Sequence, residues 1–341
     1  REQRRGQPFR GALSRLLQQA MEESLREGGK IMLLLNRRGF STHIQCPACG
    51  TAVTCPGCDI PLTFHRKDAT AICHYCDHQI PAPDVCPECH CPGIRYSGTG
   101  TQRLEAEVRA RFPDAPCLRM DTDTMRKPGS HAKALAMFRD GAARILLGTQ
   151  MIAKGLDFHD VTLVGVINAD TALNFPDFRA TERTFQLITQ VAGRTGRGDA
   201  GGRVLVQTLA PDHIAIRAAA RHDYQAFASH ELPHRRALGY PPCGSLVRIV
   251  VRGPHERETK HFSESVGDRL REAVTDQGGR VNVLGPAPAP FAKLRGRYRF
   301  QLLLRGPDGA ALRRATRAAT DDLKPPNDVQ WIADVDPYDM L

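Results

Sequence analysis

The sequence has no hydrophobic run long enough to cross a membrane. Its longest unbroken stretch of strongly apolar side chains covers residues 31–35, whereas a membrane-spanning helix needs about 20 such residues. The chain begins Arg-Glu-Gln without an initiator Met, and no apolar segment near its start could serve as a secretory signal. We therefore expect no membrane partner, and we interpret the chain as a portion of a longer protein.

Lysine is scarce as well. It stands at eight positions, which leaves 39 arginines among the 47 cationic residues, and with 37 acidic residues the formal net charge is +10. Forked guanidinium groups suit phosphate recognition, although the same arginines could be spread over a solvated surface. With 341 residues, of which 25% are charged and 41% hydrophobic, the composition indicates a globular protein with two or three folded units.

One nucleotide-binding signature is missing from the chain. No G-x-x-x-x-G-K-[ST] stretch and no Asp-Glu dipeptide occur, and the nearest candidate, residues 28–31, has neither the spacing nor the hydroxyl. A P-loop cradles phosphates with backbone N–H groups and a lysine. The sequence therefore predicts that this chain alone does not hydrolyse ATP.

Cysteine, by contrast, is abundant. Eight of the 11 cysteines form four C-x-x-C turns, here called knuckles, and each knuckle aims two thiolates at one point, as tetrahedral zinc requires. Four knuckles predict two structural zinc ions with no open ligand position. The spacing of the second and third knuckles is close to that of a zinc ribbon, so we expect the second to pair with the third and the first with the fourth, although spacing alone leaves other pairings open. The predicted ligands are Cys46, Cys49, Cys55, Cys58, Cys73, Cys76, Cys86 and Cys89.

Three alternatives compete with this interpretation. The cysteines could form disulfides, hold an iron-sulfur cluster, or share a site with a histidine ligand, namely His74, His78 or His90. Disulfides need an oxidising compartment, for which the sequence carries no targeting segment. Residues 46–91 have too few large apolar side chains to form a core unaided, which favours zinc as the agent that folds them.

Strand and helix patterns alternate on both sides of this cysteine block. Residues 12–26 show a helical stripe, residues 31–35 a buried strand, and a helix that starts near residue 101 carries Leu104, Val108 and Phe112 on one face. This order predicts an α/β domain with a mostly parallel sheet, into which the cysteine block is inserted. Further expected elements are helices 132–138 and 179–192 and strands 145–147, 161–167 and 204–207.

A second pattern begins near residue 229. Pro233, Gly239, Pro241 and Pro242 predict a linker, and the elements beyond it follow a β-α-β-β-α-β order, which is typical of a ferredoxin-like α+β domain. We expect strands at 246–251, 281–284, 299–304 and 329–334 and helices at 258–274 and 310–323. The predicted division is 1–45 for the start of the α/β lobe, 46–91 for the zinc-binding insert, 92–228 for the rest of the lobe and 229–341 for the C-terminal domain.

The C-terminal part also carries a basic run. Residues 293–317 contain eight cationic side chains and one acidic residue, Asp308, and Tyr298 and Phe300 alternate with arginines. Alternation on a strand places one set toward solvent, where arginine can bind phosphate and an aromatic ring can stack on a base. We expect Phe300 to lie in the core instead, since apolar strand residues usually face inward.

Two loops carry the remaining chemistry. Residues 148–158 follow a predicted strand directly, where an α/β sheet binds ligands, and residues 190–198 read Gln-Val-Ala-Gly-Arg-Thr-Gly-Arg-Gly. These segments resemble motifs V and VI of superfamily 2 helicases, and residues 98–101 resemble the start of motif IV. Together with the four knuckles, the run at 174–183 and the runs at 284–290 and 294–301, they resemble the PriA family of replication-restart DNA helicases.

The resemblance implies roles for individual residues. Arg197, with Arg194 beside it, would act as an arginine finger on ATP bound to another lobe, and Gln190 would also face the nucleotide. Asp157 would hold the ribose. The motif V residues Gly148, Thr149, Gln150 and Gly155 would bind the nucleotide site and couple it to the DNA strand, with ATP and Mg²⁺ bound in the complete protein.

The resemblance also implies partners and a setting. A family member would be a monomeric, ATP-dependent 3′-to-5′ helicase of the bacterial cytoplasm and nucleoid. It would bind branched and single-stranded DNA at stalled forks and other primosome proteins. Its C-terminal domain would bind DNA and the acidic tail of single-stranded DNA-binding protein, with Arg297 and Gln301 at the tail and Arg295 and Arg299 beside them.

Two rival interpretations are a scaffold of the same family that has lost its motor, and a zinc-ribbon nucleic-acid-binding module without ATP chemistry.

Overall fold

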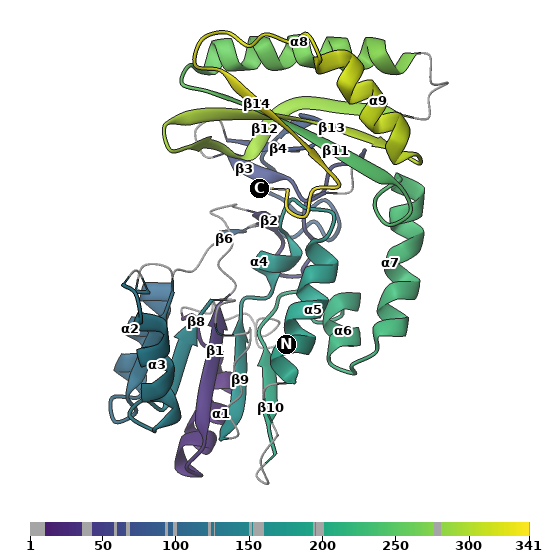
Figure 1. Ribbon diagram of the computed structural model, residues 1–341. Coiled ribbons are helices and arrows are strands. Elements are labelled where there is room, and N and C mark those ends of the chain that lie inside the picture. The colour runs from purple at the N-terminus through teal and green to yellow at the C-terminus, as the bar shows by residue number, and fades with distance from the viewer. Residues whose placement is uncertain are drawn as a thin grey trace.

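The computed structural model contains three sheets, one for each part of the chain that the sequence separates (Figure 1). We refer to residues 11–35 and 101–219 as the lobe, to residues 43–97 as the insert, and to residues 239–340 as the C-terminal domain. The structure describes residues 11–35, 43–57, 60–65, 69–92, 95–97, 101–121, 124–125, 127–149, 152, 160–193, 195, 201–275 and 281–340.

The lobe is built on five parallel strands in the order β10-β9-β1-β8-β7. Helices separate β1 from β7, β7 from β8 and β9 from β10 along the chain, because a parallel neighbour is reached only through a crossover. The predicted α/β lobe with a parallel sheet is confirmed. Its strands are β1 (Lys30–Leu35), β7 (Cys117–Met120), β8 (Ile145–Gly148), β9 (Val161–Ile167) and β10 (Arg203–Val206), and its helices are α1 (Arg15–Arg26), α2 (Thr101–Arg111), α3 (Ser130–Arg139), α4 (Asp170–Leu173), α5 (Ala180–Ala192) and α6 (Ile214–Ala219).

Both faces of this sheet are covered. Leu17 of α1 and Leu104 of α2 belong to one buried cluster, and Phe138 of α3 and Phe185 of α5 belong to the other. All six residues of β1 are buried, because alternate side chains of a central strand enter the two clusters in turn. This is why a continuous apolar run, rather than an alternating one, marks the strand in the sequence.

The insert is a small antiparallel sheet in the order β5-β4-β3-β2-β6, placed between β1 and α2. Its strands have three residues each, so neither their length nor their pattern stands out in the sequence. Its buried side chains form one cluster with residues of the lobe and of the C-terminal domain. The strands are β2 (His43–Gln45), β3 (Thr63–His65), β4 (Thr70–Ile72), β5 (Gln79–Pro81) and β6 (Arg95–Ser97).

The C-terminal domain has an antiparallel sheet in the order β12-β13-β11-β14, which is the ferredoxin-like arrangement predicted. Two helices cover one face of this sheet. The insert covers part of the other face (Figure 1). The elements are β11 (Ser245–Gly253), α8 (Glu256–Val274), β12 (Asn282–Leu294), β13 (Arg297–Gly306), α9 (Gly309–Thr320) and β14 (Gln330–Val335). Strand β12 extends ten residues beyond its predicted end at 284, since its three prolines hide its strand character.

The predicted linker near residue 229 is wrong over its first half. Residues 224–238 form helix α7 (Tyr224–Leu238), which includes Pro233, so the boundary between 228 and 229 falls inside a helix. Pro233 removes one backbone donor, which one turn of an exposed helix tolerates. The helix ends at Gly239, whose φ of 65° is left-handed, and Tyr240 donates its N–H to the carbonyl of Arg235 at 2.8 Å.

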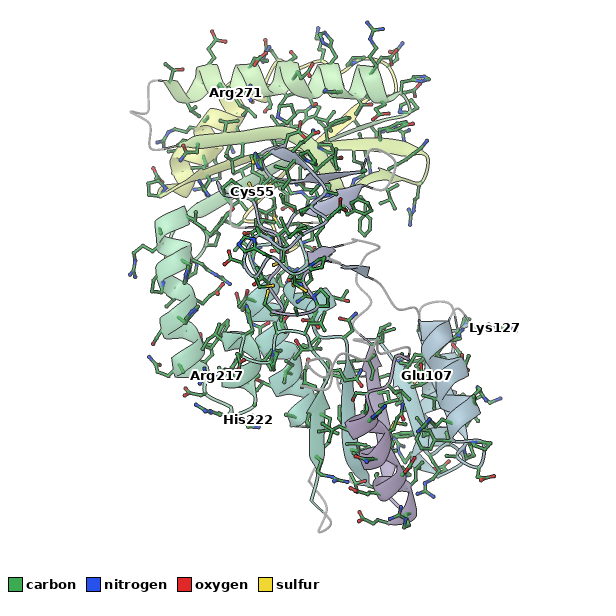
Figure 2. The ribbon with its side chains drawn as sticks, turned by 180° about the vertical axis from the view of Figure 1, so that it is seen from behind. Cys55, Glu107, Lys127, Arg217, His222 and Arg271 are labelled. Carbon is green, nitrogen blue, oxygen red and sulfur yellow. The ribbon has the colours of Figure 1, made fainter. Side chains whose placement is uncertain are left out.

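The insert lies between the lobe and the C-terminal domain, and α7 runs alongside it (Figure 1). Cys55, seen from behind in Figure 2, is in this middle layer, with Glu107 in the lobe below and Arg271 on α8 above. Among the described residues, none of the helices is both apolar enough and long enough to span a bilayer.

Candidate functional site

The first and fourth knuckles meet. The four sulfurs of Cys46, Cys49, Cys86 and Cys89 lie within 4.8 Å of one another. Sγ of Cys46 is 3.6 Å from Sγ of Cys89, and Sγ of Cys49 is 3.7 Å from Sγ of Cys86. Zinc with Zn–S bonds of about 2.3 Å separates its sulfurs by about 3.8 Å, whereas a disulfide needs about 2.05 Å. The donor set and its spacing therefore fit a zinc ion and not a disulfide.

The second and third knuckles also meet. Sγ atoms of Cys55, Cys73 and Cys76 lie within 4.8 Å of one another, with 3.6 Å between Cys55 and Cys76. Cys58 lies outside the described residues. Burial raises the pKa of the Cys55 thiol to about 12, so this thiol must give up a proton when it binds a metal.

All four knuckles share one backbone pattern. In each, the N–H of the first cysteine donates to the carbonyl five residues later, over 2.8 to 3.0 Å. Three of them place a left-handed residue four positions after that cysteine, namely Gly50, Asp77 and His90. In the fourth case, the knuckle of Cys55, the N–H donates to the carbonyl of Ile60, and residue 59 lies outside the described residues. The sequence shows the C-x-x-C spacing, and the structure adds this common turn.

The alternative ligands lie elsewhere. The ring Nδ1 of His74 is 2.7 Å from the carbonyl oxygen of Pro288. The thiol of Cys91 donates to the carbonyl of Pro92, and Cys117 is buried in the core of the lobe. Neither thiol group in the described chain includes a histidine.

The motif V loop starts at the carboxyl edge of the parallel sheet. Gly148 ends β8 and is buried, and a Cβ atom there would lie 2.6 Å from Cγ2 of Ile152 and 2.8 Å from the carbonyl of Met120. The carbonyl of Thr149 accepts the N–H of Ile152 at 3.0 Å, which turns the chain back toward the core. Gln150, Gly155 and Asp157 lie outside the described residues.

Gln190 lies at the opposite edge. It is exposed near the end of α5, which runs back from the carboxyl edge toward the start of β10 (Figure 1). Strand β9 is parallel to β1 and β10, so it starts at the amino edge of the sheet, opposite the end of β8. Residues 150, 151 and 153–159 between the two strands lie outside the described residues. Arg194 and Arg197 lie outside the described residues.

A junction of three rings, which sequence reasoning missed, joins the parts of the molecule. Phe178 of the lobe stacks on Tyr240 of the C-terminal domain, with ring centroids 4.8 Å apart. Tyr75 of the insert meets Tyr240 edge-on at 6.2 Å, and its hydroxyl accepts the N–H of Phe178 at 3.3 Å. The guanidinium carbon of Arg179 lies 4.0 Å from the Phe178 ring centroid. The run at 174–183 contains Phe178 and Arg179, but nothing in the sequence pairs it with Tyr75 or Tyr240.

The basic face of the C-terminal sheet is partly as expected. Arg299 stands directly across from Arg252 of β11. Burial, and then the Arg252 charge, lowers the pKa of Arg299. Among the described residues no carboxylate forms an ion pair with either arginine. Arg295 is exposed in the turn before β13, and Arg297 donates to the carbonyl of Asp328 at 2.8 Å.

Gln301 corrects one expectation. Its side chain is 0% exposed, and its Nε2 donates to the backbone carbonyl of His74 at 2.7 Å. In this arrangement Gln301 binds the insert and offers no surface to an acidic tail. The prediction that Phe300 lies in the core is confirmed, because it is buried.

Comparisons with known proteins agree with this architecture. The helicase conserved C-terminal domain matches residues 98–199, and the PriA DNA helicase Cys-rich region domain matches residues 55–81. The class is therefore a helicase C-terminal lobe with a zinc-binding cysteine-rich insert. The primosomal protein N C-terminal domain matches residues 236–338, which starts within α7.

Similar curated proteins carry one name. Replication restart protein PriA of Bacillus subtilis is 45% identical over 289 residues, 85% of this chain and 36% of that protein. The protein of the same name in Treponema pallidum is 41% identical over 329 residues, 96% of this chain and 50% of that protein. That in Haemophilus influenzae is 37% identical over 337 residues, 98% of this chain and 46% of that protein. The chain belongs to the PriA family and spans half or less of the length of these relatives.

Proposed function

We propose that this chain is the second motor lobe, zinc region and C-terminal domain of an ATP-dependent 3′-to-5′ DNA helicase that recognises stalled forks and initiates primosome assembly. The observation that carries the proposal is the five-stranded parallel sheet of the lobe, together with the match of residues 98–199 to the helicase conserved C-terminal domain. Gly148, at the carboxyl end of β8, opens the motif V segment that would couple a bound nucleotide to a DNA strand. The helicase domain match argues against the zinc module without ATP chemistry.

Arg197 and Arg194 would stabilise the charge that develops on the γ-phosphate, and Gln190, which is exposed near the end of α5, would face the same nucleotide. An arginine finger contributes about 10³- to 10⁵-fold in turnover. Gly155 and Asp157 would complete the site from the motif V loop. ATP and Mg²⁺ would be held mainly by another part of the complete protein, since this sequence contains no P-loop.

The zinc region would hold two structural ions, each bound by four thiolates, with Cys58 as the fourth ligand of the second site. The shared turn of all four knuckles supports this stoichiometry. Closed tetrahedral sites have no position for a reacting water, so the ions would supply folding energy rather than chemistry. Cys73→Ser should lower the zinc content from two to one, and an unchanged content would refute the ligand set.

The DNA and partner surface would be the arginine-rich end of the C-terminal sheet. Arg295, Arg297 and Arg299 can bind phosphates or the carboxylates of an acidic tail, such as that of single-stranded DNA-binding protein, and Arg252 adds a fourth cation to the face. Gln301 has no part in this surface, because it is buried against His74.

The decisive experiment is Arg197→Ala in the complete protein. Unwinding should be lost while DNA binding survives, because the guanidinium acts on the nucleotide and not on the strand. Loss of both together would count against the assigned role. The chain of 341 residues should show no DNA-stimulated ATP hydrolysis, and measurable hydrolysis would refute the division of the nucleotide site between two lobes.

A further inference from the structure

The knuckle of Cys73 and Cys76 differs from the other three. Between their cysteines those carry Pro-Ala, Pro-Gly and Pro-Glu, whereas this one carries His74 and Tyr75. Both side chains are almost fully buried, at 1% and 0% exposure. Neither side chain belongs to the group of residues that could hold the metal, so their burial between two domains needs another explanation.

His74 forms hydrogen bonds with the C-terminal domain. Its Nδ1 lies 2.7 Å from the carbonyl of Pro288 on β12, and because a carbonyl only accepts, this nitrogen is the donor. Its own backbone carbonyl accepts Nε2 of Gln301 on β13, also at 2.7 Å. One residue thus bonds two adjacent strands of the C-terminal sheet.

Tyr75 forms a hydrogen bond with the lobe. Its hydroxyl accepts the N–H of Phe178 at 3.3 Å, and its own N–H points to Sγ of Cys73 at 3.4 Å. A metal-bound thiolate strengthens this N–H···S bond, because the acceptor then carries charge. The first site has the same kind of bond, from the N–H of Ala48 to Sγ of Cys46. The side chain of Ala48 is a methyl group, however, which forms no hydrogen bond to another domain.

We propose that the second thiol site is an interdomain clamp. Metal held by Cys55, Cys73 and Cys76 fixes His74 and Tyr75, which are positioning residues that hold the C-terminal domain against the lobe. The clamp rests on the zinc binding proposed above. In the described part of the chain, the hydrogen bond of Gln45 to Asp170 and the close approach of Gly50 to Leu209 tie the first site to the lobe.

Other contacts across the junction limit the size of the effect. Phe178 still stacks on Tyr240, and Arg183 still donates to the carbonyl of Tyr338. Loss of the clamp should therefore loosen the junction without releasing the domain. A buried hydrogen bond contributes about 0.5 to 1.5 kcal/mol net, which corresponds to an increase in local opening of up to about tenfold.

The test measures amide hydrogen exchange and zinc content together in this chain. Tyr75→Phe should keep both zinc ions and raise exchange in residues 174–183 by up to about tenfold. Gln301→Leu should keep both ions and raise exchange in residues 284–304. Cys73→Ser should lose one ion and raise exchange in both segments, and adding Tyr75→Phe to it should produce no further increase at 174–183.

Cys49→Ser is the matched control, because it removes one ion from the first site. Exchange at 174–183 and 284–304 should then stay at the wild-type level. Equal loosening by Cys49→Ser and Cys73→Ser, or additive effects of Cys73→Ser and Tyr75→Phe, would overturn the clamp. If Cys73→Ser does not fold, wild-type exchange during stepwise zinc removal decides in the same way. A wild-type chain that binds no zinc would instead refute the zinc binding proposed above.

Discussion

Gln45, the residue before the first cysteine ligand, donates its Nε2 to Oδ1 of Asp170 at 3.1 Å, and both side chains are buried. Asp170 also accepts the hydroxyl of Thr208 at 2.9 Å and the N–H of Leu209 at 2.9 Å. One carboxylate therefore ties the first metal site to the loop that follows β10. Hydrogen bonds that are buried or half-buried thus hold the insert to the lobe at this point.

Asp170→Ala should lower the free energy of unfolding by about 2 to 4 kcal/mol, because it removes the acceptor of three donors, of which that of Gln45 is buried and those of Thr208 and Leu209 are half-buried. Urea unfolding followed by circular dichroism measures this. Asp268→Ala is the control, since its pair with Arg271 is exposed and such pairs contribute about 0 to 1 kcal/mol. Equal losses in the two variants would contradict the role given to Asp170.

Gly148→Ala should destabilise the lobe, because the new Cβ would lie 2.6 Å from Cγ2 of Ile152 and 2.8 Å from a backbone carbonyl. Overpacking of this kind costs about 1 to 3 kcal/mol. Gly193→Ala provides the comparison, since its Cβ would meet nothing closer than 3.7 Å. The midpoint of thermal unfolding is measured for both variants. A Gly148→Ala chain as stable as Gly193→Ala would show that the end of β8 shifts to accommodate the new methyl group.

Asp177 should titrate above the usual range of an aspartate. Burial raises the pKa of its carboxyl, and the Arg183 guanidinium at 2.8 Å opposes the rise. A raised pKa means that the folded state binds more protons than the unfolded state, so this group makes folding less favourable as pH rises from 3.8 through the folded pKa. Carboxyl-carbon NMR measures the titration directly.

Arg183→Met should move that titration further upward, since it removes the opposing charge. Asp177→Asn should flatten the pH dependence of stability in the same window. A carboxyl that titrates below 3.8 in the wild-type chain would show that the ion pair outweighs burial.

The order of elements was predictable, and the way in which the parts meet was not. The helical stripe of residues 12–26 and the apolar strand at 31–35 are local patterns, and the structure has both, as α1 and β1. The C-x-x-C spacing likewise indicated which residues could share a metal. Helix α7 was missed because Pro233 and Gly239 look like linker residues, although one lies within a helix and the other ends it.

The junction of Tyr75, Phe178 and Tyr240 had no comparable signal. These residues are separated by about a hundred and by about sixty positions, and no periodicity connects them. Gln301 shows the same limit of sequence-based prediction. On a strand beside arginines it reads as a surface residue, and only the position of the insert makes it buried. Side-chain burial between domains depends on tertiary packing, which local pattern does not encode.

The paired arginines of the C-terminal sheet give the last prediction. Arg252 and Arg299 face each other across β11 and β13 without an ion-pair partner in the described part of the chain, so their charges are available to phosphates. The double variant Arg252→Ala/Arg299→Ala should weaken single-stranded DNA binding and reduce the slope of log affinity against log salt by about 1.4, which is two contacts at about 0.7 each. Arg313→Ala/Arg314→Ala removes the same charge from α9, which packs on the opposite face, and fluorescence anisotropy across a salt series should leave its slope close to wild type. If the α9 variant loses as much slope as the sheet variant, the DNA follows net charge rather than this face.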